Sequence, residues 1–394
     1  MPSTPPPVTS DFYDLEALLD DEDRKTLHRV RDFMDTEVAP IINDYWTRAQ
    51  FPRQLIPGLA ELGIAGTPYS GYGCPGKSTL LDGMISMELS RGDPSVSTFM
   101  GVHGGLAMGT LHICGSEGQK ERWLPAMARM ELIGAFGLTE PESGSDVARG
   151  LRTTCRRDGD SWVLNGQKKW IGNGSFADLV IIWAQDEETD RVLGFVVEQG
   201  TEGFSAVDLQ DKIALRAVQN ALITLKDVRV PEDNRLQEAN SFKDTAKVLR
   251  MTRAGVAWSA VGCARGAYEH ALRYANERTQ FGKPISGFQL VQDLLVRMLG
   301  NITASAAMCA RLSELQDAGR MTDEQASLAK AFSTVRMRET VGWARELMGG
   351  NGILLEYDVG RYVADAEAIY SYEGTREVNT LIVGRAITGR GAIV

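Results

Sequence analysis

The sequence predicts an α+β protein in which a helical region, a β-rich region and a second helical region follow one another. Apolar residues recur at three- and four-residue steps in the first third of the chain and again after about residue 240, which indicates helices that bury one face. Between them, short β-favouring runs alternate with turn signals. At 394 residues, the chain is also too long for one ordinary core. We expect an N-terminal helical domain (1–133), a central antiparallel β-domain (134–240) and a C-terminal domain resembling a four-helix bundle (241–394).

The first region contains at least three helical patterns. One apolar face is formed by Leu27, Val30, Met34 and Val38. Pro40 limits the continuation of that helix, because proline lacks a backbone N–H and clashes with the preceding turn. Helical patterns also cover residues 79–90 and about 117–130.

The central region contains β-favouring runs at residues 162–164, 179–183, 193–197 and 221–230. Asp158-Gly-Asp160, Asn165-Gly166 and Asn173-Gly174 are turn signals that separate such runs. No ten-residue helical pattern lies between them, so an antiparallel barrel or sandwich is expected.

The last region returns to the helical period. One apolar stripe consists of Phe288, Val291, Leu295, Met298 and Ile302. Thr322 and Gln325 have capping-box spacing at the start of a long helix, which we expect to stop at Gly349-Gly350.

Composition excludes several classes of function. The net charge of −10 argues against a nucleic-acid surface, which needs clustered Lys and Arg. No apolar run approaches the ~20 residues that cross a bilayer, so no membrane partner is expected. The four histidines have no metal-ligand spacing, so we expect no metal site. The scattered cysteines predict unpaired thiols and a reducing compartment: Cys74, Cys114, Cys155, Cys263 and Cys309.

The two ends of the chain carry no targeting signal that we recognise. Residues 1–10 are proline-rich, lack the basic and apolar parts of a signal peptide, and are predicted to be disordered. The last residues do not match a peroxisomal ending. A cytoplasmic location is expected, although the sequence does not distinguish it from an organelle matrix.

One formal motif is set aside. Residues 71–78 satisfy the phosphate-loop pattern G-x-x-x-x-G-K-[ST]. Pro75 removes one of the backbone donors that such a loop needs, and residues 62–68 make a poor strand. A turn that leads into a helix is the better interpretation. No G-x-G-x-x-G follows a strand either, so a Rossmann domain has no support.

The segment Phe136-Gly-Leu-Thr-Glu-Pro-Glu-Ser-Gly-Ser-Asp146 lies at the switch from helix to sheet. Its hydroxyls and small residues suit a polar cofactor ring and phosphates. A capped turn between two domains explains the same residues equally well.

The segment Gly166-Gln-Lys-Lys-Trp-Ile-Gly-Asn-Gly174 places Trp170 between two turn signals. Its indole could stack on a flat ring or lie in the core. Taken alone, the segment favours the core.

The segment Ile369-Tyr-Ser-Tyr-Glu-Gly-Thr-Arg376 places Glu373 between an aromatic residue and a glycine. Burial there would raise the carboxyl pKa towards neutrality, where the group can act as a general base. A single glutamate at the start of a helix is more often only a favourable partner of the helix dipole.

Taken together, these segments resemble one family. The ordered series is Leu138-Thr-Glu-Pro141 with Gly144-Ser-Asp146, then Lys168-Lys-Trp-Ile-Gly-Asn173, Arg278-Thr-Gln-Phe-Gly282, Gly349-Gly-Asn-Gly352 and Tyr372-Glu-Gly-Thr375. This series resembles the acyl-CoA dehydrogenases and covers residues 12–389. Within that superfamily, residues 71–76 and 212–216 are similar to parts of the glutaryl-CoA dehydrogenases and the plant short-chain acyl-CoA oxidases.

The resemblance implies an FAD site between the β-domain and the C-terminal helices of a homotetramer. The cofactor-binding residues that it implies are Phe136, Leu138, Thr139, Ser145, Trp170, Ile171, Gly172, Arg278, Gln280, Phe281, Gln289, Glu346, Gly349, Gly350, Thr375 and Glu377. Of these, residues 278–289 would act partly across a subunit interface, and residues 346–350 would face the cofactor of the neighbouring subunit. The substrate-binding residues that it implies are Ser97, Ser145, Arg253, Tyr372 and Gly374.

The resemblance also implies a reaction, the α,β-dehydrogenation of a short- or medium-chain acyl-CoA, as in β-oxidation of fatty acids. Glu373 would take the α-proton, the hydride of the β-carbon would pass to flavin N5, and an electron-transfer flavoprotein would receive the electrons. A catalytically inactive acyl-CoA-binding scaffold is the alternative from a different class, and the presence of Glu373 argues against it.

Two departures from the family pattern bear on substrate and electron acceptor. The glutaryl-CoA dehydrogenases have an arginine for the distal carboxylate where this chain has Ser97, and an acidic residue of that pocket is replaced by Ser90. An unfunctionalised acyl chain is therefore expected rather than glutaryl-CoA. Dehydrogenases commonly have threonine where this chain has Gly172, whereas the plant short-chain oxidases also have glycine there. The alternative of an acyl-CoA oxidase, which passes electrons to oxygen, therefore stays open.

Overall fold

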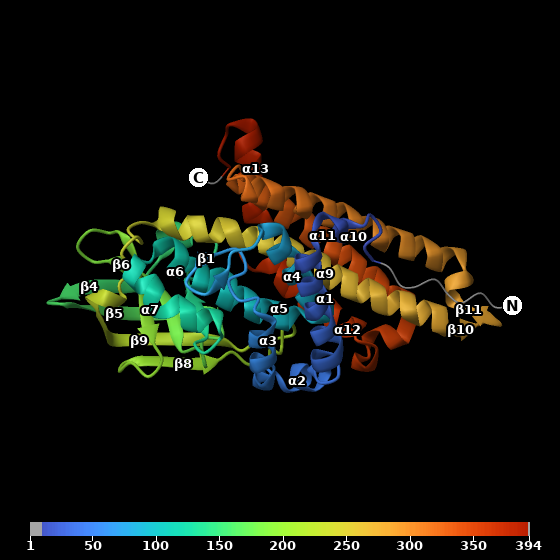
Figure 1. Ribbon diagram of the computed structural model, residues 1–394, viewed down its shortest axis with the longest axis horizontal. Coiled ribbons are helices and arrows are strands. Elements are labelled where there is room, and N and C mark those ends of the chain that lie inside the picture. Colours follow the sequence, from blue (N-terminus) through green and yellow to red (C-terminus); the bar gives the residue numbers. More distant parts are fainter. Residues whose placement is uncertain (1–9, 393–394) are drawn as a thin grey trace.

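The sheet lies at one end of the molecule in the computed structural model, which describes residues 10–392, and the long C-terminal helices extend from it to the other end (Figure 1). The predicted order of helical, β and helical regions is confirmed. The exact domain boundaries remain predictions. Residues 1–9 lie outside the described residues, but Ser10 is buried against Glu269 and Arg265, so the prediction of disorder is wrong for Ser10. None of the helices in residues 10–392 has the length and apolar character needed to cross a membrane.

The N-terminal region is helical apart from one short hairpin. Its elements are α1 (Asp21–Phe33), α2 (Ile42–Arg48), α3 (Ile56–Leu62), β1 (Ser70–Gly71), β2 (Cys74–Pro75), α4 (Thr79–Gly92), α5 (Pro94–Met100), α6 (Gly109–Cys114) and α7 (Glu117–Ala128). The predicted apolar face of α1 and the π-helical turn after it is fully buried.

The segment that matched the phosphate-loop pattern forms an ordinary turn. The hairpin β1–β2 leads directly into α4, and no parallel strand precedes it in the described chain. The Ser78 hydroxyl caps α4 by accepting a hydrogen bond of 3.1 Å from the backbone N–H of Leu81. This confirms the interpretation of a turn that enters a helix.

The central region is a seven-stranded mixed sheet with the order β3-β6-β4-β5-β9-β8, in which β7 pairs with β6. Its elements are β3 (Gly134–Gly137), α8 (Val147–Gly150), β4 (Thr154–Asp158), β5 (Ser161–Gly172), β6 (Leu179–Asp186), β7 (Val192–Glu198), β8 (Phe204–Asp208) and β9 (Asn220–Pro231). The predicted β-domain is confirmed, but antiparallel pairing does not hold throughout, because β6 pairs in parallel with β3 and β4. Each of these pairs is joined by a long connection, which parallel pairing requires.

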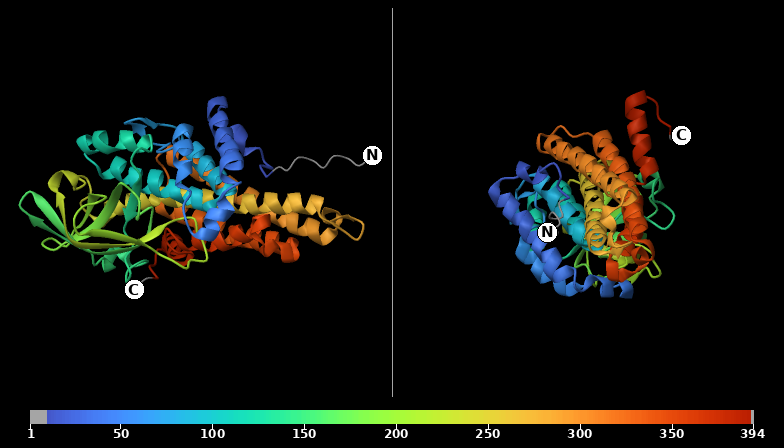
Figure 2. Two further views of the ribbon diagram at one scale, coloured as in Figure 1. Left: turned by 90° about the horizontal axis from the view of Figure 1, so that it is seen from below. Right: turned by 90° about the vertical axis from the view of Figure 1, so that its right-hand side faces the viewer.

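The C-terminal region consists of long helices that run beside one another (Figures 1 and 2). Its elements are α9 (Phe242–Glu277), β10 (Thr279–Gln280), β11 (Lys283–Pro284), α10 (Gln289–Asp317), α11 (Asp323–Leu347), α12 (Val359–Ser371) and α13 (Arg376–Thr388). Helix α9 extends from the sheet to the hairpin β10–β11. The predicted capping box of Thr322 and Gln325 is present at the start of α11, and a glycine with positive φ, Gly349, follows the end of that helix.

Helices α4 and α9 approach each other closely because glycines lie at their contact. A Cβ added to Gly262 would lie 2.1 Å from the backbone oxygen of Met87, and one added to Gly83 would lie 2.1 Å from the indole nitrogen of Trp258. No side chain fits at either position. This contact brings the polar face of α4 against α9 and thereby shapes one wall of the candidate site.

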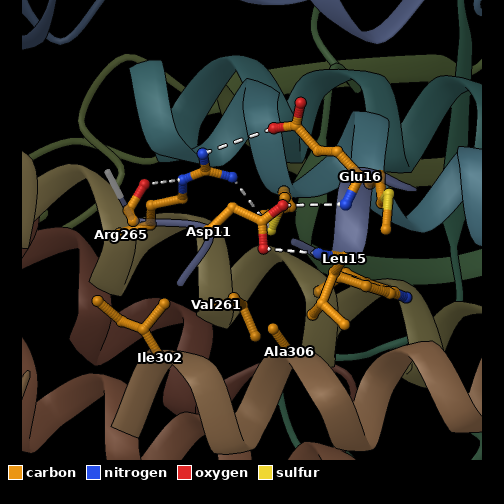
Figure 3. Close-up of a pocket in the computed structure, with 11 residues that line it drawn as sticks. Asp11, Leu15, Glu16, Val261, Arg265, Ile302 and Ala306 are labelled. Atoms are coloured by element: carbon orange, nitrogen blue, oxygen red, sulfur yellow. Dashed lines mark hydrogen bonds and ion pairs between the residues drawn. The ribbon is translucent and has the colours of Figure 1, made fainter. Parts of the chain in front are cut away.

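The start of the described chain is joined to α9 by an ion pair of 3.8 Å between Glu16 and Arg265 (Figure 3), and Arg265 also belongs to a buried ionic network. Glu88 forms ion pairs with Arg31, Arg91 and Arg265 at 2.8, 2.7 and 3.0 Å. Beside it, Asp11 accepts hydrogen bonds from the backbone N–H groups of Leu15 and Glu16, both at 2.9 Å. The cavity of about 10 Å³ at this place holds at most a water molecule, so the network is structural rather than a ligand site.

Candidate active site

A cavity of about 980 Å³ lies where the sheet meets α9, and all three regions of the chain contribute to its walls. Of the residues predicted to bind cofactor or substrate, those that line it are Ser97, Phe136, Leu138, Thr139, Ser145, Trp170, Ile171, Gly172, Arg253, Tyr372, Glu373, Gly374 and Thr375. The individual roles of these residues stay predictions. Their convergence on one cavity defines the candidate active site.

Glu373 lies in the turn between α12 and α13. Its φ of +55° is in the left-handed region, which non-glycine residues rarely adopt, and Gly374 follows with φ +85°. The Glu373 carboxylate accepts a hydrogen bond of 2.5 Å from the hydroxyl of Thr252 on α9. Burial raises the pKa of this carboxyl, and the Thr252 hydrogen bond and the charges of Arg253 and Lys330 oppose that rise. A carboxyl of this kind is suited to accept a proton from a weak carbon acid.

Arg253 is the cation on the same wall. Burial lowers the pKa of its guanidinium, while nearby Glu373 acts in the opposite direction. Its Nε has no hydrogen-bond partner in the part of the chain that the structure describes. A buried donor of this kind calls for an acceptor, and an anionic or carbonyl ligand in the cavity would supply one.

The cavity has a polar section between α4, α5 and α9. The hydroxyl oxygens of Ser86 and Ser259 are 2.8 Å apart, and those of Ser97 and Ser259 are 3.2 Å apart. Asp82 lines the same cavity one turn before Ser86 on α4. Burial raises the pKa of the Asp82 carboxyl to about 7, and Asp317 adds to this effect. No cation takes part in these contacts.

The opposite wall comes from the ends of β3 and β5 and from the loop after β3. Phe136, Leu138 and Thr139 form one part of it, and Trp170 and Gly172 form the other. The indole of Trp170 is 54% exposed, so the interpretation of this residue as core is wrong. The pairing of β5 with β9 shifts register between Lys168 and Ile171, and such a bulge redirects a side chain that strict alternation would bury.

Gly172 lies close to the π-helical segment that follows α5. A Cβ added to Gly172 would lie 3.0 Å from Cγ2 of Val102. A larger residue at this position therefore requires Val102 to move by a few tenths of an ångström.

The remaining predicted residues are not brought to this cavity within one chain. Arg278, Gln280, Phe281 and Gln289 lie at the β10–β11 hairpin and the start of α10, and Phe281 is 94% exposed. The helical rise places this end of α9 about 40 Å from Thr252. Glu346, Gly349 and Gly350 are exposed at the end of α11, and the neighbouring Asn351 donates a hydrogen bond to the hydroxyl of Tyr274 near the same end of α9. Glu377 is exposed on the first turn of α13.

Several residues at the site carry no signal that the sequence alone could reveal. Thr252 precedes Arg253 in a helical segment without a recognisable motif, although the Thr252 hydroxyl donates a hydrogen bond to Glu373. Lys330 lies on the buried face of α11 and binds backbone oxygens on both sides of Glu373. Ser86 and Ser259 fit the helical period as ordinary small residues. Only the pairing of distant helices assigns them to the site.

These walls fit a flat, polar-edged ring placed beside Glu373. Phe136, Leu138 and Trp170 offer apolar surface, and Thr139 offers a hydroxyl. Gly172 leaves space that a side chain would fill. The arrangement defines the class of protein: an oxidoreductase that holds an organic redox cofactor between a sheet and a helical bundle, with a carboxyl group lining the same cavity.

Comparisons with known proteins identify the family. The N-terminal, middle and C-terminal domain models of acyl-CoA dehydrogenase match residues 20–131, 135–228 and 242–388. A short-chain specific acyl-CoA dehydrogenase of Megasphaera elsdenii is 32% identical over 94% of this chain and 98% of its own length. The chain belongs to the acyl-CoA dehydrogenase family and is an FAD-dependent oxidoreductase, as its resemblance implied.

Two solved structures are similar over nearly the whole chain. The structure of glutaryl-CoA dehydrogenase from Mycobacterium smegmatis has 40% sequence identity and a TM-score of 0.93, and the match covers 96% of this chain and 98% of that one. A structure of a glutaryl-CoA dehydrogenase from the same organism in complex with FADH2 has 37% identity and a TM-score of 0.94, covering 97% and 98%. The expected FAD cofactor and fold are thereby confirmed.

Proposed function

We propose that this enzyme performs the α,β-dehydrogenation of a short- or medium-chain acyl-CoA with Glu373 as the base. The observation that carries the proposal is the carboxyl of Glu373, which faces the cavity with a raised pKa and a single hydroxyl partner, Thr252. An α-proton of a thioester is a weak acid, so its removal needs a base whose proton affinity is higher than that of an ordinary carboxylate.

The residues of the chain would divide the work between binding and proton transfer. Glu373 accepts the α-proton as the α C–H bond breaks, while the electron pair of the β C–H bond leaves as hydride and the Cα=Cβ bond forms. Bound FAD would supply the acceptor for that hydride. Phe136, Leu138, Thr139, Trp170 and Gly172 would hold the flavin ring. Tyr372 and Gly374 would border the acyl group and exclude water, and Ser145 and Arg253 would bind the CoA part.

The substrate that we propose carries no distal charge. Where glutaryl-CoA dehydrogenases are expected to have an arginine, Ser97 contacts only other serine groups at its hydroxyl. A distal carboxylate placed beside Ser97 would lie in the polar section that contains Asp82, where no cation takes part in the described contacts, and an unpaired buried charge is costly. An unbranched acyl chain of four to eight carbons is the natural first substrate to test.

We further propose a homotetramer in which a second copy completes the FAD site. Two groups of predicted residues lie beside the end of α9 that is distant from the cavity, and they are too far away to reach the cavity of their own chain. They are Arg278, Gln280, Phe281 and Gln289 near the hairpin, and Glu346, Gly349 and Gly350 at the end of α11. Exposed apolar side chains at this end, Phe281, Leu290, Val296 and Ile353, support burial against another copy. Arg278 could then bind a phosphate of the cofactor bidentately.

The electron acceptor that we propose is an electron-transfer flavoprotein, with oxygen as the alternative that Gly172 keeps open. The five cysteines are unpaired in the structure, which is consistent with the reducing compartment that we expect, in the first place the cytoplasm.

The test is an anaerobic screen of acyl-CoA thioesters, with the visible flavin absorbance as the signal. Butyryl- or hexanoyl-CoA should bleach the flavin of the wild-type enzyme. Glu373→Gln should keep its FAD and reduce it roughly 10²–10⁴-fold more slowly, since the amide cannot accept a proton. Glu188→Gln, an exposed glutamate in the β6–β7 turn, is the matched control. Reduction of Glu373→Gln at the wild-type rate would assign the base elsewhere. If no thioester bleached the wild type, the scaffold alternative would stand.

A further inference from the structure

A buried lysine, Lys330, donates hydrogen bonds to the turn that contains Glu373. Lys330 lies on α11 and is 0% exposed. Its Nζ donates a hydrogen bond of 2.9 Å to the backbone oxygen of Tyr370 and one of 2.6 Å to the backbone oxygen of Gly374. These two acceptors come before and after Glu373, so one ammonium group closes the chain into a loop around the base.

This loop is under conformational strain that requires such support. Glu373 has φ +55°, and the left-handed conformation is unfavourable for a residue with a side chain because Cβ comes close to the following carbonyl oxygen. Asn379 gives additional support, because its Nδ2 donates to the backbone oxygens of Gly374 and Thr375 at 2.9 and 3.0 Å. The end of α12 also leaves backbone oxygens without helical partners, and a cation is favourable there.

Lys330 bonds to carbonyl oxygens rather than to a carboxylate. Burial lowers the pKa of its ammonium to about 8, and Glu373 is the largest of the effects that oppose this. Arg253 on α9 and Glu377 on α13 are the other charged groups near it. A buried charge without a carboxylate partner is costly for stability. The position of Lys330 beside Glu373 accounts for this buried charge better than a purely structural role does.

We propose that Lys330 is a positioning residue for the base: it fixes the left-handed turn that points Glu373 into the cavity, and it places a positive charge beside the Glu373 carboxylate. The role in catalysis rests on the proposed function, but the effect on the turn and on the carboxyl does not. A nearby positive charge stabilises the carboxylate, so its removal must raise the pKa of Glu373 further.

Three variants separate the two parts of this role. Lys330→Met removes both the charge and the donors, Lys330→Gln keeps donors without the charge, and Lys330→Arg keeps the charge. Arg31→Met is the control, because it removes another cation that pairs with a buried glutamate, away from the cavity. All are compared at equal FAD content.

The first readout needs no turnover. The Glu373 carboxyl is titrated by difference infrared spectroscopy, with Glu373→Gln as the reference, and the amides of residues 371–375 are followed by hydrogen exchange. We expect Glu373 to titrate at higher pH in Lys330→Met and Lys330→Gln than in the wild type, and at the wild-type pH in Arg31→Met. Exchange at residues 371–375 should be fastest in Lys330→Met and intermediate in Lys330→Gln.

The second readout is anaerobic flavin reduction by hexanoyl-CoA as a function of pH. In Lys330→Met, the rate of flavin reduction should fall at least about tenfold at neutral pH, and KM should change less. The acid limb of the pH–rate profile should move to higher pH. Lys330→Arg should recover part of the lost rate. An unchanged Glu373 titration together with unchanged exchange in Lys330→Met would overturn the proposal. If Lys330→Met does not fold, Lys330→Gln decides the charge effect alone. A wild type that no acyl-CoA reduces refutes the proposed function, and the first readout then still decides the role of Lys330.

Discussion

Glu88 is fully buried and Glu373 lines the cavity, and the two carboxyl groups have opposite pKa shifts. Glu88 forms ion pairs with three arginines, and these cations hold the pKa of its carboxyl well below the usual range although burial acts to raise it. Glu373 accepts one hydrogen bond from a threonine hydroxyl, and burial raises its pKa. The number of cations in contact separates a carboxylate that stays ionised from one that is suited to exchange a proton.

This difference also explains where each residue lies. The Glu88 network joins α1, α4 and α9 and leaves no space for a ligand. The cations near Glu373, Arg253 and Lys330, act on its charge without forming the close pairs seen at Glu88. A base paired with an arginine at 2.8 Å would lose the proton affinity that its reaction needs.

The largest effect on stability is expected from the structural carboxylate. Glu88→Gln removes the buried anion that Arg31, Arg91 and Arg265 share, and breaking a buried ion pair costs roughly 3–5 kcal/mol. The arginines keep their other partners, which are Glu16, Asp35 and Glu269. The Glu88 carboxyl has a folded-state pKa below its unfolded value, so its contribution is present above the unfolded value near 4.5 and is lost as pH falls through the folded pKa. Urea unfolding at pH 7 and at pH 4 should therefore show a loss that shrinks in acid. Equal free energies of unfolding for wild type and Glu88→Gln at pH 7 would contradict the structural role of the Glu88 ion pairs.

The cavity should also discriminate between substrates by the rate at which they reduce the flavin. The serine hydroxyls and Asp82 supply no cation for a second carboxylate, so hexanoyl-CoA should reduce the flavin at least about tenfold faster than glutaryl-CoA, since an unpaired buried charge costs several kcal/mol. Stopped-flow absorbance with both thioesters measures the ratio. Faster reduction by glutaryl-CoA would mean that a cation reaches the distal group in the complex.

The base itself should oppose folding slightly at neutral pH. The pKa of Glu373 is raised on folding, so the ionised form is disfavoured in the folded state. The cost is present above the folded pKa and disappears below the unfolded value near 4.5. Glu373→Gln should thus raise thermal stability at pH 7, on the order of 1 kcal/mol, and the gain should fade towards pH 4. A destabilised Gln variant at pH 7 would mean that the Thr252 hydrogen bond outweighs the burial of the charge.

The smallest effect is expected at Gly172. In the proposed binding mode, glycine would leave space beside the flavin edge, and we expect it to raise the oxygen reactivity of the reduced enzyme by a few fold. Peroxide formation during acyl-CoA turnover is compared in wild type and Gly172→Thr, with Gly172→Ala as the control for the contact with Val102. If air reoxidises the wild type no faster than the Thr variant, Gly172 does not control access of oxygen.

Local patterns in the sequence predicted most of the fold. The capping residues Thr322 and Gln325 and the apolar face from Leu27 to Val38 are determined by neighbours within a few residues, and both are present as expected. The stripe from Phe288 to Ile302 is helical from Gln289 onwards but only partly buried towards its start, because the beginning of α10 lies next to the exposed β10–β11 hairpin. The parallel pairs of β6 were missed, since no local pattern records which distant strand becomes a neighbour.

The candidate site was predictable only where a motif marked it. Glu373 stands in a recognisable segment, and the structure places it in the cavity. Thr252 is 121 residues from Glu373 and contacts it only through the packing of α9. Lys330 has no sequence neighbour that marks its role. The segment around Trp170, taken alone, favoured the core, and the sequence did not reveal the bulge in β5 that redirects this side chain.

The proposed proton removal by Glu373 can be measured separately from hydride transfer with acetyl-CoA, which has α-protons but no β-carbon. In D2O, the wild-type enzyme should exchange deuterium into the methyl group of acetyl-CoA while its flavin stays oxidised, and NMR follows the exchange. Glu373→Gln should exchange at least about 10²-fold more slowly, while Glu88→Gln, at a temperature where it is folded, should exchange like the wild type. Equal exchange by wild type and Glu373→Gln would contradict the assignment of Glu373 as the base.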